Sequence, residues 1–407
     1  MQYRIDKKSG NSLSVLGFGC MRFPRKSGIP VSGSQNYASI DYKKSEALVL
    51  EAVQRGVNYF DTAYLYPGSE ETTGSILANA KIRGKVFIAT KMPLLFCKQG
   101  ADLEKFFQKS LERLKTKYVD YYLLHMITDS NQWEQFKKWG VESWIAEKKK
   151  SGQIKQIGFS FHGSQPDFLQ VLGDYDWEFC QIQYNYSDPN FQAGVTGLKK
   201  AAETMPVIIM EPLLGGKLAT GLPADAGQAF KKANPDLSPA QWGLKWIWDQ
   251  SEPTVVLSGM NTPEQLAENL TVADSAVPGM LTRAEHELFD QVRGIFSASY
   301  KIHCTGCNYC MPCPQGVNIP ACFSAYNTSY TMGFNIGIQQ FITSIGITSE
   351  KTSSPHLCVK CGKCETHCPQ HLPIMQNLEL VRHRLEPFWV RWGGGIARTF
   401  LKSGRKH

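Results

Sequence analysis

The sequence predicts an α/β protein in two parts, a (β/α)8 barrel over residues 1–280 and a mainly α-helical, cysteine-rich domain over residues 281–407. Eight short apolar runs alternate with amphipathic stretches in the first part, which is the count and length typical of such a barrel. Nine of the twelve cysteines lie between residues 304 and 368. With 407 residues, 42% of them hydrophobic, the chain is long enough for two domains.

Barrel strands are expected where short apolar runs end in turn or charged residues. An open doubly wound sheet is the rival architecture, but it would need a Gly-x-Gly-x-x-Gly turn, and residues 17–22 lack the third glycine. A hairpin, residues 3–5 and 13–16, is expected before the first strand. The expected strands are residues 15–19, 57–61, 86–91, 119–125, 154–160, 179–184, 206–210 and 254–258.

Amphipathic helices are expected between these strands. Residues 283–298 are expected to form a helix that bridges the two domains, and the apolar segment 314–357 to form helices that pack the cysteine runs against the barrel. The expected barrel helices are residues 45–55, 70–80, 103–114, 133–150, 166–172, 239–249 and 263–272.

Two cysteine runs, each followed by a proline, dominate the second part. The second run reads C-x2-C-x2-C-x3-C-P, the spacing with which bacterial ferredoxins hold a [4Fe–4S] cluster. Three thiolates two residues apart can wrap one cluster, and the fourth can reach another, so two [4Fe–4S] clusters are expected. The first run is one residue short before its last cysteine. The expected ligands are Cys304, Cys307, Cys310 and Cys313, then Cys358, Cys361, Cys364 and Cys368.

Other uses of these cysteines are less consistent with the pattern. Zinc needs only four ligands per site and does not require a third cysteine at the same interval. The chain begins without an apolar signal region, so we expect a cytoplasmic protein in which disulfides are disfavoured. Cys322 is either a substitute ligand for the shortened first run or a core thiol.

Charge and hydropathy argue against two classes of partner. The net charge of +8 is modest, and no concentrated basic stripe with interleaved aromatics indicates a nucleic-acid surface. No run reaches 18 apolar residues, so no transmembrane segment is expected.

Four polar residues follow the predicted strands at the rim where barrels carry their chemistry. Asp61, Lys91 and His125 end three successive strands, and Tyr66 lies in the loop after Asp61. Taken singly, these residues have structural explanations: Asp61 could cap a helix, Tyr66 could pack on a loop and His125 could be a core imidazole. An acid, an amine, an imidazole and a phenol on one rim together indicate a catalytic site.

Several segments in order resemble the aldo-keto reductase family, in the branch with a C-terminal ferredoxin-type domain. They are residues 56–63 (GVNYFDTA) with Tyr66, 89–91 (ATK), 120–125 (DYYLLH), 157–160 (IGFS), 181–185 (QIQYN) and 262–269.

The resemblance implies that Tyr66 is the general acid–base. At its ordinary pKa of about 10, a tyrosine gives up its proton poorly at neutral pH. A nearby ammonium lowers this pKa by stabilising the phenolate, and Lys91 would have this role. Asp61 would hold Lys91 charged and in place. His125 would donate a hydrogen bond that orients the carbonyl.

A nicotinamide site is also implied, with departures from the family pattern. Phe161 stands where an asparagine usually follows the serine, Met210 replaces a stacking aromatic, and neither Gly259 nor Gln265 supplies a cation for an adenosine 2′-phosphate. The choice between NADP(H) and NAD(H) therefore stays open, with a flavin as an alternative. The implied cofactor-binding residues are Gly19, Cys20, Met21, Ser160, Gln181, Met210, Gly259, Gln265 and Asn269.

The function expected from these features is an oxidoreductase that exchanges hydride between NAD(P)H and a small carbonyl or alcohol. Its [4Fe–4S] clusters would transfer electrons to or from a redox partner protein. The alternative is an iron–sulfur electron-transfer protein whose barrel is a non-catalytic or flavin-binding module.

Overall fold

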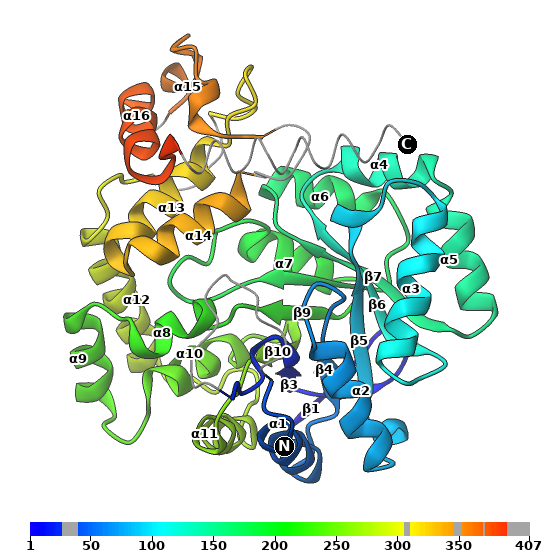
Figure 1. Cartoon of the computed structure of the whole chain (residues 1–407). Coiled ribbons are helices and arrows are strands. Elements are labelled where there is room, and N and C mark those ends of the chain that lie inside the picture. Colours follow the sequence, from blue (N-terminus) through cyan, green and yellow to red (C-terminus); the bar gives the residue numbers. More distant parts are fainter. Residues whose placement is uncertain (27–39, 305–309, 346–351, 369–370, 389–407) are drawn as a thin grey trace. The chain divides into compact units, whose positions relative to one another are not determined.

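The computed structural model describes residues 1–26, 40–304, 310–345, 352–368 and 371–388. The first part is a closed barrel of eight parallel strands surrounded by helices (Figure 1). Because neighbouring strands are parallel, all their carboxyl ends meet at one rim. The predicted (β/α)8 barrel is confirmed. The strands are β3 (Leu16–Gly19), β4 (Tyr59–Asp61), β5 (Phe87–Met92), β6 (Val119–Ile127), β7 (Ile154–Phe161), β8 (Phe179–Gln183), β9 (Val207–Met210) and β10 (Pro253–Ser258).

The helices around the barrel bury one apolar stripe each. In α3, Leu103, Phe107 and Leu111 recur every fourth residue and are all buried. Helix α10 begins with a reciprocal cap, because Ser238 accepts from the Gln241 amide and Gln241 accepts from the Ser238 amide. The helices are α1 (Tyr42–Gln54), α2 (Ser69–Asn79), α3 (Ala101–Arg113), α4 (Ser130–Lys138), α5 (Val141–Lys150), α6 (Gln165–Gly173), α7 (Gly194–Ala202), α8 (Lys217–Thr220), α10 (Pro239–Trp248) and α11 (Pro263–Ala273).

One expected helix is wrong in its extent. Residues 133–150 do not form a single helix, since α4 ends at Lys138 and α5 begins at Val141. Gly140 lies between them with a φ of 78°, in the left-handed region that ends helices and that glycine adopts without strain. Helix α7 was not among the expected helices, because two glycines in its nine residues weaken the helical signal.

Large side chains from alternate strands fill the amino-terminal half of the barrel. Tyr59 of β4, Tyr121 of β6, Phe179 of β8 and Val255 of β10 belong to one buried cluster. The ring centroids of Tyr59 and Tyr121 are 5.2 Å apart, and those of Tyr121 and Phe179 are 5.1 Å apart. Leu13 joins the cluster from outside the barrel strands. The barrel is thus a packed core whose free space lies at the opposite rim.

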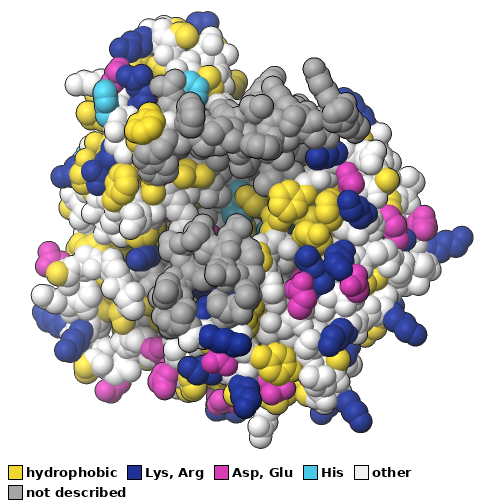
Figure 2. Space-filling view, viewed as in Figure 1, with side chains coloured by type: hydrophobic (Ala, Val, Ile, Leu, Met, Phe, Trp, Pro, Cys, Tyr) yellow, Lys and Arg dark blue, Asp and Glu magenta, His cyan; other side chains and the backbone are white. Residues whose placement is uncertain are grey.

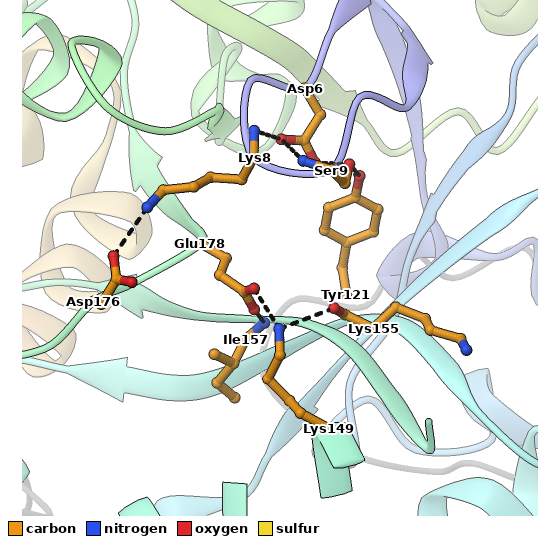
Figure 3. Close-up of polar contacts among 9 residues, drawn as sticks. All are labelled: Asp6, Lys8, Ser9, Tyr121, Lys149, Lys155, Ile157, Asp176 and Glu178. Carbon is orange, nitrogen blue, oxygen red and sulfur yellow. Dashed lines mark hydrogen bonds and ion pairs between the residues drawn. The ribbon is translucent and has the colours of Figure 1, made fainter. Parts of the chain in front are cut away.

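The predicted hairpin, β1 (Tyr3–Ile5) with β2 (Ser12–Ser14), closes this amino-terminal end. Figure 3 shows Tyr121 reaching from β6 to the turn, where its hydroxyl donates to Asp6 Oδ2 at 2.7 Å. Asp6 also accepts from the amide of Ser9 at 3.2 Å, and Lys8 pairs with Asp176 at 2.9 Å. These polar groups hold the hairpin on the barrel, at the end that serves stability in such folds.

Contacts divide the chain into two compact units. The second unit includes an excursion from the barrel, Thr220–Asp236, which carries α9 (Ala224–Ala233). Phe230 of α9 packs on Phe289 of α12 (Arg283–Ala298) with ring centroids 5.6 Å apart. The units are Met1–Ala219 with Leu237–Arg283, and Thr220–Asp236 with Ala284–His407.

The second unit is helical, as predicted. Helices α13 (Ile319–Thr331) and α14 (Phe334–Ser344) pack closely, since a Cβ at Gly337 would lie 2.3 Å from that of Ser329. Its other helices are α15 (Lys363–Thr366) and α16 (Ile374–Leu385). No helix in the described ranges has both the length and the apolar character needed to cross a membrane.

Candidate functional site

The carboxyl rim of the barrel brings together the four residues predicted to be catalytic. Asp61 ends β4, Lys91 lies in β5, and both are buried. The Lys91 ammonium donates to Asp61 Oδ1 at 2.6 Å and to the carbonyl oxygen of Thr62 at 2.7 Å. Two acceptors within hydrogen-bond distance therefore fix the ammonium at one point.

Tyr66 and His125 complete this group. Lys91 Nζ lies 5.0 Å from the centroid of the Tyr66 ring. The Tyr66 and His125 rings meet edge to face, with centroids 5.9 Å apart and an angle of 82° between their planes. The phenol ring is therefore close to both the ammonium and the imidazole. No hydrogen bond joins its hydroxyl to another residue in the described part of the chain, so that group is available to a substrate.

A bulge in β6 sets the direction of His125. The pairing of β6 with β7 shifts register between Leu124 and Ile127, and Met126 has a φ of 63°. The displaced amide of Met126 donates to Ser160 Oγ at 2.9 Å instead of to the strand ladder. Bulges next to active sites re-aim a side chain in this way. Ser160, which was predicted to bind the cofactor, therefore uses its hydroxyl oxygen to accept a hydrogen bond from β6.

Burial determines the protonation of Tyr66 and Lys91. Burial, and then the charges of Asp61, Glu211 and Cys20, raise the pKa of Tyr66 well above its ordinary value. The charge that lowers this pKa is that of Arg22 and not that of Lys91, and burial outweighs it, so the phenol keeps its proton. Burial lowers the pKa of Lys91, while the Asp61 carboxylate opposes that shift.

A second imidazole, His162, faces the site and was missed from the sequence. It follows the end of β7, and it lies close enough to Lys91 and His125 for their charges to interact. Burial and the charge of Lys91 lower the pKa of His162 to about 4. Burial, Lys91 and His162 together lower the pKa of His125 well below its ordinary value. Nδ1 of His125 is buried without a hydrogen-bond partner among the described residues, so it can engage a bound molecule.

Gln181 and Met210 form the part of the rim predicted to hold a nicotinamide. Gln181 is buried, its Nε2 lies 3.6 Å from the Met210 sulfur, and its Oε1 has no partner within the described ranges. A buried acceptor without a donor suits the amide of a carboxamide. Phe161 packs against Phe168 of α6 with centroids 5.1 Å apart, so it does not stand in for the usual asparagine at the site.

The remaining predicted cofactor residues are not all placed to touch a ligand. Cys20 is buried, and burial raises the pKa of its thiol to about 12, whereas Met21 is 52% exposed. Asn269 is buried and donates to Ser258 Oγ at 2.8 Å, which braces the end of β10. Gln265 is exposed and accepts from the amide of Asn261 at 2.9 Å.

Gly19 and Gly259 are positions where the backbone approaches closely. A Cβ at Gly19 would lie 3.3 Å from the Ser258 carbonyl oxygen. A Cβ at Gly259 would lie 3.0 Å from Cδ of Arg22, a residue not predicted from the sequence. The only feature of the sequence that could have indicated Arg22 was its position in the loop after the first barrel strand.

Aromatic residues of the loop that carries Tyr66, of the segment after β5 and of α3 pack together. The ring of Tyr64 meets Phe106 edge to face at 5.1 Å, and Phe106 lies 6.5 Å from Phe96. Phe96, in the segment after β5, is 45% exposed, and hydrophobic side chains gather over this segment in Figure 2. The guanidinium of Arg113 lies 4.2 Å from the Tyr64 ring.

The cysteine runs lie in the second unit, except that Cys307 is outside the described residues. Burial raises the pKa of Cys364, and the charges of Glu365, Cys358 and Cys313 raise it further. The last cysteine of the first run is thus near the second run, as expected if fourth cysteines cross between clusters. Among the described residues, no three side chains that bind metals are already gathered at one point. Cys322 is buried in the core, as expected of a structural thiol.

Buried polar side chains hold the segments that lead into both runs. Before the first run, Asn327 Oδ1 accepts from the amides of Lys301 and Ile302, each at 3.0 Å. Before the second run, His356 Nδ1 lies 2.6 Å from the buried carboxylate of Glu386. The described segments that lead into the two runs are therefore held in place, and the thiolate chemistry of the cysteines fits iron–sulfur clusters.

Comparisons with known proteins agree with both halves of this description. Residues 15–291 match the model of the aldo/keto reductase family, and residues 303–372 match that of a 4Fe-4S dicluster domain. The chain is 28% identical to the uncharacterized oxidoreductase YqkF of Bacillus subtilis, over 66% of this chain and 91% of that protein. It is 27% identical to the D-galacturonate reductase of Fragaria ananassa, over 60% of this chain and 80% of that protein.

Among solved structures, the aldo-keto reductase AKR11C1 from Bacillus halodurans (holo form) has a TM-score of 0.56 at 23% identity. The match covers 72% of this chain and 96% of that one, and it shows a shared fold. The matching barrel and the domain that follows it lead to one conclusion. The chain is an oxidoreductase of the aldo/keto reductase family that carries a 4Fe-4S dicluster domain after its barrel.

Proposed function

We propose that the barrel exchanges a hydride between NAD(P)H and a small carbonyl or alcohol. We further propose that two [4Fe–4S] clusters carry electrons between this reaction and a redox partner protein. The observation that carries the proposal is the position of the Lys91 ammonium, 2.6 Å from Asp61 and 5.0 Å from the Tyr66 ring, at the catalytic rim.

Each residue of the rim has a role in carbonyl reduction. A nicotinamide held by Ser160, Gln181 and Met210 would supply the hydride for the carbonyl carbon. Tyr66 Oη gives its proton to the carbonyl oxygen, and the nearby Lys91 ammonium stabilises the phenolate that remains. Asp61 keeps Lys91 charged in a buried setting. His125, neutral and without a partner at Nδ1, hydrogen-bonds the substrate oxygen.

The nicotinamide would be held at the β7–β9 side of the rim. Gln181 Oε1 would accept from the carboxamide, the Ser160 hydroxyl would donate to it, and Met210 would form an apolar surface under the ring. These residues lie next to the four catalytic ones, because β7, β8 and β9 follow β6 around the barrel. Oxidation of an alcohol would use the same groups in reverse.

In the second domain, the proposed ligand sets cross between the runs. One cluster would be held by Cys304, Cys307, Cys310 and Cys368, and the other by Cys358, Cys361, Cys364 and Cys313. Each cluster carries one electron at a time, so passing the two electrons of a hydride to them would need a carrier that accepts two electrons and releases them singly, such as the flavin named as an alternative cofactor. Cys361 and Val359 are exposed, so a partner can approach the second run. Thiolate-held clusters suit a reducing compartment such as the cytoplasm.

Anaerobic mixing tests the coupling. NADH or NADPH, tested with and without a flavin and with and without a carbonyl substrate, should in at least one of these combinations bleach the cluster absorption of the full-length holoprotein. Cys361→Ser should abolish bleaching of the second cluster and leave nucleotide binding unchanged. Cys97→Ala, which removes a buried thiol of the barrel outside the runs, should behave like the wild type.

Two outcomes would contradict parts of the proposal. Carbonyl reduction with clusters that stay oxidised would show that the dicluster domain serves another purpose. If a partner reduces the clusters and no nucleotide-dependent carbonyl chemistry is found, an electron-transfer protein with a non-catalytic barrel is favoured. Phe161 and Met210, which replace the residues usual in the family's cofactor site, are the reason for this alternative.

A further inference from the structure

The loop that carries Tyr66 is closed on itself by buried side chains. Thr62 begins this loop after β4, Ser69 begins α2 at its other end, and both are buried. Their hydroxyl oxygens lie 2.8 Å apart, and the Ser69 hydroxyl donates to the carbonyl oxygen of Cys20 at 2.9 Å. A hydroxyl has one proton, so Thr62 is the donor of the bond that closes the loop. Within the loop, the Tyr66 amide donates to the Ala63 carbonyl oxygen, and the Tyr66 carbonyl oxygen accepts from the Ser69 amide, each at 2.9 Å.

Both ends of this loop are bound to consecutive residues of β5. At its start, the carbonyl oxygen of Thr62 accepts from the Lys91 ammonium at 2.7 Å. At its end, Glu70 Oε1 accepts from the Thr90 hydroxyl at 2.7 Å, and the side chains of Glu70 and Thr90 are fully buried. Consecutive residues of a strand point to opposite faces, so the loop is tied to β5 from both faces of the strand. The position of Tyr66 is thereby referred to the strand that carries Lys91.

Glu70 is a buried carboxyl group that no step of carbonyl reduction uses. Burial raises its pKa, and the hydrogen bond from Thr90 and the charge of Arg113 oppose that shift. Arg113 Nη1, from α3, lies 3.3 Å from Glu70 Oε2. A hydrophobic side chain of similar volume often stabilises a buried position as well as an ionisable one does. A carboxyl group at this position, one residue after the Tyr66 loop, is therefore better explained by the geometry that it fixes than by the stability that it adds.

We propose that Glu70 and Thr62 are positioning residues that hold the Tyr66 phenol at its working distance from the Lys91 ammonium. This inference rests on the proposed proton transfer from Tyr66. The ammonium lies 5.0 Å from the centroid of the phenol ring, and a displacement of about 1 Å at a reacting group costs on the order of 100-fold in rate. The side chains of Glu70 and Thr62 are fully buried, so they act on the reaction through the loop and not by contact with a nucleotide or a substrate. Their loss should therefore lower kcat and leave nucleotide binding unchanged.

Kinetics of carbonyl reduction, nucleotide affinity by calorimetry and the urea midpoint, all measured on anaerobic holoprotein, test this inference together. Glu70→Met removes the acceptor for Thr90 and should lower kcat about 10- to 100-fold, with KM and the nucleotide Kd within about threefold. Glu70→Gln keeps an oxygen acceptor for Thr90 and should recover most of the lost kcat. Thr62→Val keeps the shape of the side chain and leaves Ser69 bonded to Cys20, so it should fold normally and lower kcat about 10-fold.

Glu71→Gln is the matched control, because Glu71 is the next residue of α2, its side chain is 49% exposed and it pairs with Arg113 at 3.0 Å. It should keep the kcat of the wild type. A Glu70→Met variant with a lower urea midpoint but normal kcat, or a Glu70→Gln variant as slow as Glu70→Met, would overturn the inference and leave the proposed function in place. Normal kcat in Thr62→Val would remove Thr62 from it. Wild-type protein that reduces no carbonyl would remove the proposed function and this inference with it.

Discussion

Replacing Tyr66 with phenylalanine separates chemistry from folding and cofactor binding. The hydroxyl makes no hydrogen bond to another described residue, so its removal leaves no buried group unpaired and the free energy of unfolding should change by less than about 1 kcal/mol. The proton donor is lost, however. Turnover should fall about 10²- to 10⁴-fold, which at about 1.36 kcal/mol per decade corresponds to roughly 2.7–5.5 kcal/mol of transition-state stabilisation.

The assay is carbonyl-dependent oxidation of the nicotinamide, with the dissociation constant of the nucleotide measured in parallel. Tyr64→Phe is the matched control, because Tyr64 lies on the same loop but packs on Phe106 and Arg113. Tyr64→Phe should keep its turnover within about threefold. If Tyr66→Phe keeps near-normal turnover, the proton comes from His125 or from water, and the reasoning about Tyr66 is refuted.

Three further predictions concern stability and metal content. Tyr121→Phe removes a donor to buried Asp6 and should lower the free energy of barrel unfolding in urea by about 1–3 kcal/mol without changing activity; an unchanged midpoint would contradict the role given to the hairpin. Burial lowers the pKa of His162 to about 4, so between pH 6.5 and 4 the unfolded chain binds a proton that the folded chain does not. Stability should therefore fall as pH falls through this range, and His162→Gln should reduce the slope; an identical slope would place the effect elsewhere. Anaerobically purified protein should contain about eight irons with matching sulfide, whereas stoichiometric zinc without sulfide would remove the iron–sulfur account.

The sequence predicts the barrel well because its signals are local. Each strand is a short apolar run, and Asp61 and Lys91 could be placed on the rim from their positions at the ends of such runs. The break at Gly140 also had a local signal, a glycine inside an amphipathic pattern. These features depend on neighbours in the chain, so they can be read without the fold.

The rest depends on contacts between distant segments. The bulge that aims His125 appears only when β6 is paired with β7, because the displaced Met126 amide needs Ser160 as its acceptor. Nothing in the sequence distinguishes Arg22. Its surroundings appear only in the fold, where Gly215 and Gly259, which are distant in the chain, leave room for its side chain. Likewise, Thr220–Asp236 groups with the second unit through packing such as Phe230 on Phe289.

The most direct test of hydride chemistry at the barrel rim is isotope transfer. NADH deuterated at C4, on either face, would be incubated with holoprotein and a small carbonyl, and the alcohol analysed by mass spectrometry. One deuterium on the carbinol carbon, with Tyr66→Phe slowing its appearance, is the predicted result. An alcohol whose new carbon-bound hydrogen comes from water would show that electrons and protons arrive separately, and would contradict direct hydride transfer at the rim.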